Sequence, residues 1–441
     1  MRVGISFFFL IISGVVWGQT DSLSSWSTKL NSKNHPINTS IHRYYNPTIA
    51  HYGDESDIQI NLISDLSASS NNLSSAFIQR LLLGGMIDEP LKDKASDLLV
   101  DDNQSGFDWV NATWFNTSLG DSSPYRLHLG IQYQTHRGIA YTPDLYTVAF
   151  YGNKSFAGQD AILDNSQYNG FVWMGYKAAL SRQYSSEYGL FTASIGAGFL
   201  QGLSGEELNI YNGNLFTSEN GAYLDLEYNF RYQNAGSGAV RIDKTRGTGW
   251  VGDLFFSWQN PKQNLTANLT VADFGVIQWN VEAYEYSGDS SIRFEGIDIT
   301  ELLISGTDAA LGDGIILLEI LDVDSVSTEF TSSIPMRVDA NISYETENGY
   351  LLTAGTFTRV QTVYNPLFYL RAGKYVLPET YLSLIASYGG YGGLGIGIDF
   401  QQQLGPYISV HAGSSSLLGF VAPESFNAAS AYAAIRIAFN R

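Results

Sequence analysis

The chain has 441 residues, with 24 Lys and Arg against 43 Asp and Glu, and a formal net charge of −19. This acidic balance disfavours a nucleic-acid partner, because such a partner needs a basic surface that neutralises phosphates. The absence of Cys excludes disulfide bonds and thiolate metal sites. The 44 Gly and 28 Tyr are typical of a tightly turned all-β protein with aromatic side chains at membrane interfaces.

Residues 1–18 have the pattern of an export signal. Arg2 supplies a positive end, Val3 to Val16 form a nearly unbroken apolar run, and Gly18 precedes a plausible cleavage site before Gln19. After this segment no apolar stretch approaches the roughly 20 residues that a membrane-spanning helix needs. The sequence therefore predicts a cleaved signal peptide, and we expect any passage through a membrane to be made by strands.

An alternation of apolar and polar residues returns repeatedly from residue 57 to the end of the chain. In one segment Leu127, Leu129, Ile131 and Tyr133 alternate with His128, Gly130, Gln132 and Gln134. This period of two gives a strand one apolar and one polar face. Repeated along a chain, it is the pattern of a barrel in a Gram-negative outer membrane. We therefore predict an all-β fold, a single antiparallel transmembrane β-barrel surrounded by outer-membrane lipid.

The first predicted elements are an arm, a strand and a long loop. Residues 19–56 are polar without a clear period, which predicts a periplasmic or plug-like arm before a barrel at 57–441. The first strand is expected at 57–69, with Ile58, Ile60 and Leu62 facing lipid and Gln59 and Asn61 facing the lumen. Residues 71–105 are expected to form a structured loop or partial plug, because Phe77, Ile78, Leu81 and Leu82 have helical spacing and 89–99 follows with Pro90 near its start.

Further strands follow about every dozen residues. We expect them at 107–118, 126–138, 143–154, 168–182, 187–202, 206–217, 221–234, 247–260, 263–275, 328–345, 349–361, 366–376, 379–388, 394–403, 406–416 and 429–440. A second long structured loop is predicted at 276–326, with a hairpin around Ser287–Ser291 and an apolar piece at Ile315–Leu321 that is compatible with a helix. Because some of these segments can merge or stay outside the wall, we predict roughly 14 strands, closed by pairing the last strand with the first.

No chemical motif in the sequence outweighs its structural explanation. Gly390, Gly392 and Gly395 match a dinucleotide-binding pattern, but a strand follows them where that site requires a helix. Asp322, Asp324 and Glu329 lack the spacing of a calcium-binding loop, and the six His residues lack metal-ligand spacing. A lipase-like role for His128 is far less expected than a position lining the lumen. We predict no catalytic residue, no cofactor and no metal, and hence no enzyme.

Three segments of the chain resemble an uncharacterised family of outer-membrane barrels from Bacteroidota. They are Asn46-Pro47-Thr48-Ile49-Ala50, Phe150 to Gly158, and Gly249 to Asp253 continuing to Val271–Trp279. That family is similar in layout to FadL-type long-chain fatty-acid channels and to PorV-type barrels of the type IX secretion system. In the FadL group an Asn-Pro-Ala element belongs to the arm that plugs the lumen, and the resemblance therefore implies a plug role for Asn46 and Pro47, with Thr48 in place of the Ala.

Two functions remain open at this point. The first is a FadL-like channel for hydrophobic or amphipathic small molecules, which predicts an apolar cavity above the arm and a lateral or axial exit. The second is a structural or secretion-associated scaffold that binds secretion or surface proteins, which predicts a filled lumen and an apolar patch on the external loops. An outer-membrane enzyme is a weaker third possibility. We favour the channel slightly.

Overall fold

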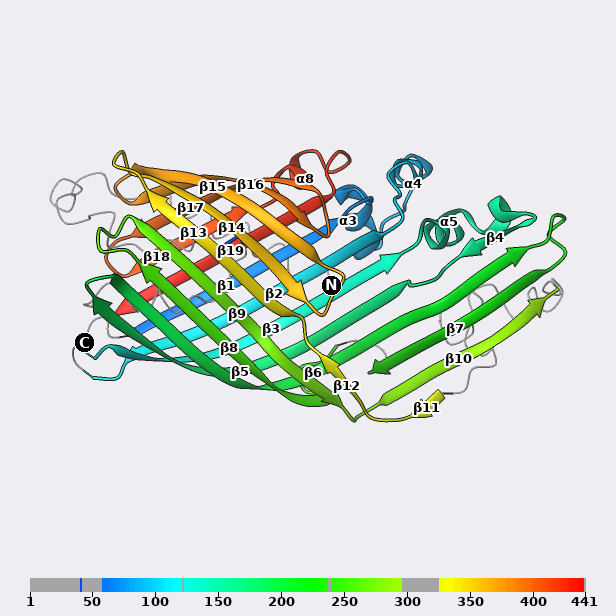
Figure 1. The fold of residues 1–441 in the computed structure, drawn as a ribbon, viewed down its shortest axis with the longest axis horizontal. Helices are drawn as coiled ribbons and strands as arrows, with labels where there is room; N and C mark the ends of the chain where they lie inside the picture. The colour runs from blue at the N-terminus through cyan, green and yellow to red at the C-terminus, as the bar shows by residue number, and fades with distance from the viewer. Residues whose placement is uncertain (1–39, 42–57, 121–122, 237–239, 296–324, 440–441) are drawn as a thin grey trace.

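The chain folds into one closed, antiparallel β-barrel of 14 strands (Figure 1). The computed structural model describes residues 40–41, 58–120, 123–236, 240–295 and 325–439. The wall consists, in order around the barrel, of β1 (Ile58–Ser70), β2 (Asn103–Ser118), β3 (Tyr125–Tyr141), β5 (Gln167–Ser186), β6 (Gly189–Thr217), β8 (Gly247–Gln259), β9 (Leu265–Trp279), β13 (Met336–Glu345), β14 (Tyr350–Val360), β15 (Asn365–Leu377), β16 (Thr380–Gly390), β17 (Leu394–Leu404), β18 (Ile408–Ser414) and β19 (Ala428–Phe439). The predicted fold class and strand number are confirmed.

The barrel closes between its first and last strands, as predicted. Ile58 at the start of β1 lies opposite Phe439 at the end of β19, and the pairing continues to Ser69 opposite Ala428. This pairing leaves no open sheet edge in the wall, and therefore satisfies backbone amides that lipid could not hydrogen-bond.

The two faces of the wall have opposite character. On β3, Leu129 and Ile131 are 44% and 51% exposed on the outside, whereas His128 between its apolar neighbours is fully buried inside. On β1, Gln59 and Asn61 are buried and Leu62 is exposed, as the alternation predicted. An apolar exterior around a polar interior is the arrangement of a barrel that lies in a lipid bilayer.

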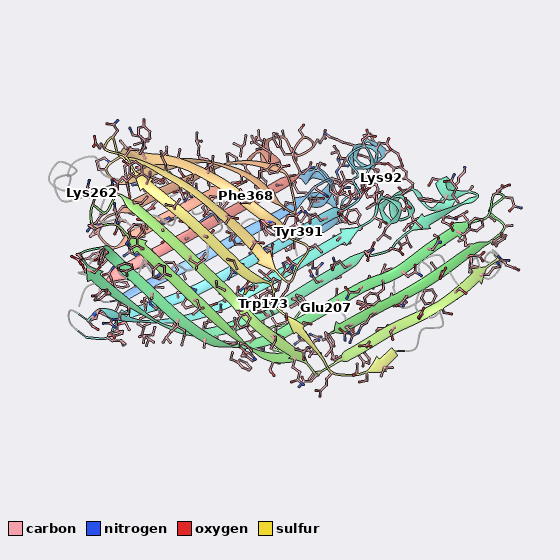
Figure 2. The ribbon with its side chains drawn as sticks, in the orientation of Figure 1. Lys92, Trp173, Glu207, Lys262, Phe368 and Tyr391 are labelled. Atoms are coloured by element: carbon pink, nitrogen blue, oxygen red, sulfur yellow. The ribbon has the colours of Figure 1, made fainter. Side chains whose placement is uncertain are left out.

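The two ends of the barrel differ in the length of their connections (Figure 1). At one end, here called the turn end, short turns join neighbouring strands, as between β5 and β6 and between β13 and β14. The other end, here called the loop end, carries the long connections. Exposed Phe368 lies on the wall, between Lys262 at the turn end and Lys92 at the loop end (Figure 2). In outer-membrane barrels the short turns are periplasmic and the longer loops external, so the loop end corresponds to the external end of such barrels.

Short helices cover part of the loop end. They are α3 (Ser75–Leu83), α4 (Glu89–Ser96), α5 (Pro143–Tyr151), a 3-10 turn at Asn153–Phe156 and α8 (Leu418–Val421). Leu73, Phe77, Leu91, Tyr141 and Tyr146 form a buried cluster beneath α3, α4 and α5. The helical spacing at residues 77–82 therefore predicted α3 correctly, and α4 is also present. None of the described helices is long and apolar enough to cross a membrane.

A sheet projects from the barrel at the loop end. Strand β6 has 29 residues, and its first part pairs with β8 whereas its last part pairs with β7 (Leu224–Ala235) and β4 (Gln159–Ile162). Strand β10 (Ala283–Phe294) pairs with β7 and with β11 (Ser325–Ser327), and β12 (Phe330–Ser333) pairs with β9. The prediction of two strands at 187–202 and 206–217 was wrong. Gly202 and Gly205 do not form a turn but lie within β6. The absence of a side chain at these two positions leaves room for the ring of Trp279.

Three further predictions were wrong for local reasons. Residues 143–151 form α5 rather than a strand, because the Thr142 hydroxyl accepts a hydrogen bond from the Leu145 amide and Pro143 occupies the first turn. The expected hairpin at 287–291 lies in the middle of β10, which pairs continuously with β7. The expected strand at 328–345 is divided into β12 and β13 at Pro335, which has no amide proton to donate.

Several predicted features lie outside the described residues. They are the signal peptide at 1–18, Asn46 and Pro47 in the arm, the apolar piece at Ile315–Leu321, and Asp322 and Asp324. The arm enters the description only through Ser40 and Ile41, both of which are buried.

Candidate functional site

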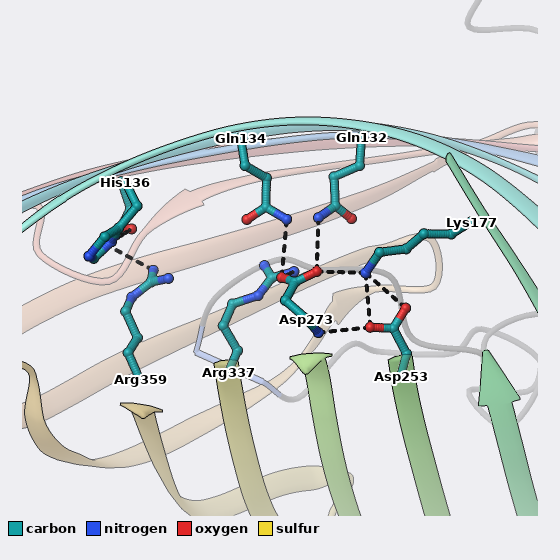
Figure 3. Close-up of polar contacts among 9 residues, drawn as sticks. Gln132, Gln134, His136, Lys177, Asp253, Asp273, Arg337 and Arg359 are labelled. Atoms are coloured by element: carbon teal, nitrogen blue, oxygen red, sulfur yellow. Dashed lines mark hydrogen bonds and ion pairs between the residues drawn. The ribbon is translucent and has the colours of Figure 1, made fainter. Parts of the chain in front are cut away.

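An ionic network crosses the barrel lumen (Figure 3). Asp273 of β9 is fully buried, and its carboxylate accepts hydrogen bonds from Gln132 and Gln134 of β3 at 3.3 and 3.1 Å. The Lys177 ammonium of β5 lies 2.6 Å from Asp273 Oδ1 and 2.8 Å from Asp253 Oδ2 on β8. Arg337 of β13 also pairs with Asp273. These residues, called the lumenal network below, join strands on opposite sides of the lumen.

A β-bulge places Asp273 in this position. The pairing of β8 with β9 shifts between Gly252 and Leu254, so two residues of β9 oppose Asp253. Asp273 has a φ of 63°, and its amide donates at 2.8 Å to the side-chain oxygen Asp253 Oδ1 of the neighbouring strand β8. Bulges commonly re-aim a side chain next to a functional site. Here the bulge turns a carboxylate toward two cations inside the lumen.

A second ion pair crosses the lumen beside the first. Asp108 Oδ2 on β2 lies 3.0 Å from Arg359 Nη2 on β14, and its other oxygen lies 2.7 Å from His136 Nδ1. Tyr391, from the connection between β16 and β17, packs with its ring against Gly106, where a Cβ would lie 2.0 Å from the ring. Charged and aromatic side chains therefore meet across the middle of the barrel.

Apolar clusters occupy other parts of the interior. On the loop-end side of the lumenal network, Phe171, Trp173, Leu200, Ile277 and Trp279 pack together with Phe330 and Ile334. The second cluster, on β14, β15 and β16, comprises Phe357, Tyr369 and Ile385, and Ile41 of the arm is buried against it. The Ser40 hydroxyl donates to Asp339 Oδ2 on β13 at 3.0 Å. At least these two arm residues thus lie inside the barrel.

Two cavities meet at the wall near the lumenal network. The larger, of about 540 Å³, is lined mostly by apolar side chains of β5, β6, β8 and β9, among them the exposed Leu180 and Ile195. The smaller, of about 40 Å³, lies against Lys177, Asp253 and Arg337 of the network. Both cavities are lined by Ser194, Leu254 and Phe255. This part of the wall, next to the bulge, therefore contributes to both linings.

Three polar side chains are joined by short hydrogen bonds on the inner face of β2, β3 and β5. His128 Nε2 lies 2.6 Å from Ser181 Oγ, and His128 Nδ1 lies 2.7 Å from Asn116 Oδ1. All three residues are fully buried from solvent. Ser181 also lines the 540 Å³ cavity. The arrangement is a serine, an imidazole and an oxygen acceptor in series.

An apolar patch is exposed at the loop end. Leu81, Leu82, Leu83 and Met86 at the end of α3 are between 42% and 81% exposed. The turn after α3 is fixed, because the Arg80 guanidinium donates to the Met86 carbonyl at 3.0 Å and pairs with Asp88 at 2.7 Å. The patch, called the α3 patch below, is thus held outward by defined contacts.

A family model described as "Family of unknown function (DUF5723)" matches residues 56–412. The chain belongs to this family. The match covers nearly the whole barrel, from just before β1 into β18. No curated protein sequence matches the DUF5723 chain.

The DUF5723 chain is also similar in layout to solved outer-membrane channels. A mutant of the monoaromatic hydrocarbon channel TodX is 9% identical, with a TM-score of 0.47 over 92% of this chain and 98% of that chain. A FadL homologue of Pseudomonas aeruginosa is 10% identical, with a TM-score of 0.41 over 90% and 93%. The toluene transporter TbuX of Ralstonia pickettii is 10% identical, with a TM-score of 0.40 over 90% and 92%. Similarities of this strength define no substrate for the DUF5723 chain.

The sequence anticipated only part of this site. The alternation placed His128, Gln132 and Gln134 on the lumenal face, and the structure confirms that placement. The network partners Lys177, Asp273 and Arg337 and the hydrogen bond between His128 and Ser181 were missed. The signal that could have found Lys177, Asp273 and Arg337 is their charge. A charged side chain within a membrane-spanning strand usually has a partner of opposite charge.

Proposed function

We propose that the protein is an outer-membrane channel for hydrophobic or amphipathic small molecules, with a lateral exit through the wall between β6 and β8. The observation that carries the proposal is the pair of cavities that share Ser194, Leu254 and Phe255. One cavity presents exposed apolar side chains on the lipid side, and the other contacts the lumenal network. An apolar molecule inside the barrel has a short path to the membrane at this point.

The remaining architecture is consistent with a channel in its closed state. The lumenal network and the Asp108–Arg359 pair obstruct a straight axial path. Since a lateral exit delivers its cargo to lipid, it does not require an open axis. The α3 patch offers an apolar surface at the loop end of the barrel, where a hydrophobic molecule would first bind.

We further propose that residues 19–56 act as the plug, with Asn46 and Pro47 within it. The support is that Ser40 and Ile41 are buried against strands β13 to β16 inside the barrel. Export by a cleaved signal peptide and residence in a Gram-negative outer membrane belong to the same proposal. They are supported by the apolar exterior of the barrel and by the pattern of residues 1–18.

The test is uptake of a radiolabelled long-chain fatty acid by Gram-negative cells that lack their own fatty-acid channel. Cells that produce the protein should take up the label faster than cells with an empty vector. Ser194→Phe fills the space between the two cavities and should abolish the gain. The control is Ser409→Phe, because Ser409 is equally buried on the inner face but on β18, away from both cavities. Equal uptake with and without the wild-type protein would contradict the proposal.

The second candidate function is a scaffold that binds a secretion or surface protein through its loops. It is favoured by the α3 patch, since Leu83 and Met86 are 74% and 81% exposed. In that case Leu83→Asp and Met86→Asp would release a partner that co-purifies with the wild-type barrel. Fatty-acid uptake would then be the same with and without the protein.

A further inference from the structure

The 540 Å³ cavity is a groove on the lipid side of the wall. Leu180 of β5, Ile195 of β6 and Leu254 of β8 line it, and their side chains are between 40% and 65% exposed on the outside of the barrel. The volume lies within the range of roughly 300–1,000 Å³ that is usual for pockets that hold a small organic molecule. The groove therefore offers a concave apolar surface to molecules in the membrane.

The groove exists because a small residue lies between two large ones. Ala193 of β6 is directly opposite Arg182 of β5 on one side and Phe256 of β8 on the other. All three residues are exposed on the outer face and line the cavity. The methyl group of Ala193 is much shorter than its two neighbours, and the surface of the wall is therefore depressed between them.

Arg182 places a positive charge at the margin of the groove. It lies directly opposite Tyr125 of β3, and its guanidinium is 5.3 Å from the centre of the Tyr125 ring. In the part of the chain that the structure describes, no carboxylate forms an ion pair with Arg182. Since the chain carries a net charge of −19, an exposed cation without an acidic partner is unusual here and is available to an anionic ligand.

The position of Arg182 along its strand matches the depth of a lipid head group. Towards the turn end, the outward residues that follow on three neighbouring strands are aromatic: Tyr184, Phe191 and Trp258. Away from the turn end, the next outward residues are aliphatic, with Leu180 opposite Ile195. Aromatic belts mark the interface between membrane and water, and long Arg side chains extend from the hydrocarbon to that interface. Arg182 therefore lies where the interface passes into the hydrocarbon.

We propose that this groove binds an anionic phospholipid, with an acyl chain over Ala193 and Ile195 and the phosphate at Arg182. The aliphatic lining provides contacts for the chain, and a guanidinium can donate two parallel hydrogen bonds to a phosphate. The turn end corresponds to the periplasmic end of outer-membrane barrels, so the lipid comes from the periplasmic leaflet. The inference does not rest on the channel function, because a lipid can occupy the groove whether or not any molecule crosses the wall.

The experiment measures lipid retention by native mass spectrometry of the full chain, folded in detergent. Phosphatidylglycerol and phosphatidylethanolamine with the same acyl chains are added in equal amounts. The wild type should retain the anionic phosphatidylglycerol about fivefold better, as expected for one basic side chain at an anionic lipid. Arg182→Gln should abolish this preference. Ala193→Phe fills the depression and should reduce retention of phosphatidylglycerol although Arg182 is still present.

Two variants on β15 are matched controls. Lys374 lies directly opposite Tyr350 with its Nζ 4.7 Å from the ring centre, as Arg182 lies over Tyr125, but it is not part of the groove lining. Lys374→Gln should therefore retain phosphatidylglycerol like the wild type. Ala372→Phe adds the same bulk to another exposed outward alanine and should also have no effect.

Heat-modifiable migration on gels establishes that each variant is folded. Equal retention of the two lipids by the folded wild type would overturn the proposal. It would also be overturned if Lys374→Gln lost as much phosphatidylglycerol as Arg182→Gln, because retention would then reflect surface charge without a groove. Undiminished retention by Ala193→Phe would exclude the groove as the site of the acyl chain. Fatty-acid uptake is measured separately, so failure of the channel function would leave these results unchanged.

Discussion

Asp108 on β2 and Arg359 on β14 lie half-way around the barrel from each other, yet Asp108 Oδ2 and Arg359 Nη2 are 3.0 Å apart. The contact is possible because the long Arg359 side chain reaches Asp108 across a lumen that is narrow at this level. Both are almost completely buried. This ion pair therefore ties opposite walls of the barrel directly together.

Removal of Arg359 should destabilise the barrel. Arg359→Ala removes one partner of a buried ion pair, a loss that costs about 3–5 kcal/mol, and leaves Asp108 with its contact to His136. The measurement is reversible urea unfolding in lipid vesicles. Arg293→Ala is the control, since Arg293 forms an exposed pair with Asp225 on the projecting sheet and its loss should leave stability unchanged. Equal stability of Arg359→Ala and wild type would show that the lumenal pair contributes nothing.

Displacement of the arm should open the barrel. In planar bilayers we expect the intact protein to be silent and a variant lacking residues 20–50 to conduct. Ile41→Asp should give part of that conductance, because it places a charge against Phe357, Tyr369 and Ile385. Ser40→Ala removes one hydrogen bond to Asp339 and should have a smaller effect. Silence of the folded deletion variant would mean that the wall residues alone close the lumen.

Two substitutions at Asp273 should distinguish the loss of its carboxylate from the strain of the bulge backbone. Asp273→Ala and Asp273→Gly both leave Lys177 and Arg337 without their shared carboxylate. Only Gly accepts a φ of 63° without strain, so Asp273→Gly should be more stable than Asp273→Ala by about 1–2 kcal/mol. Urea unfolding of the two variants measures the difference. Equal stability would indicate that the bulge relaxes once the carboxylate is gone.

Glu207 on the projecting sheet should make stability depend on pH. Burial raises the pKa of its carboxyl above the ordinary 4.5, although Ser332 and Arg231 oppose this shift. The folded state then binds a proton more tightly than the unfolded state, so stability falls as pH rises from 4.5 through the raised value. Glu207→Gln should remove this loss and be more stable than wild type at pH 7 but not below pH 4.5. Exposed Glu187→Gln should behave like wild type, and parallel pH curves for Glu207→Gln and wild type would contradict the prediction.

The sequence predicted the wall well because each strand carries its own signal. The alternation around His128 assigned lipid and lumen faces without knowledge of any neighbour, since side chains on a strand point to opposite sides in turn. It failed where a local cap or a distant ring decided the structure. Thr142 begins a helix where the alternation indicated a strand, and Trp279 occupies the space at Gly202 and Gly205, where the sequence indicated a break.

The sequence by itself determined that this chain forms a closed barrel with an apolar exterior, because alternation and chain closure follow from strand geometry alone. It did not determine which inward residues meet. That Lys177, Asp273 and Arg337 form one network, and that Ser181 lies beside His128, depends on strand register, the bulge and the width of the lumen. A shift of one residue in register would turn every one of these side chains to the lipid. Only the tertiary structure decides such contacts, since they join residues far apart in the chain.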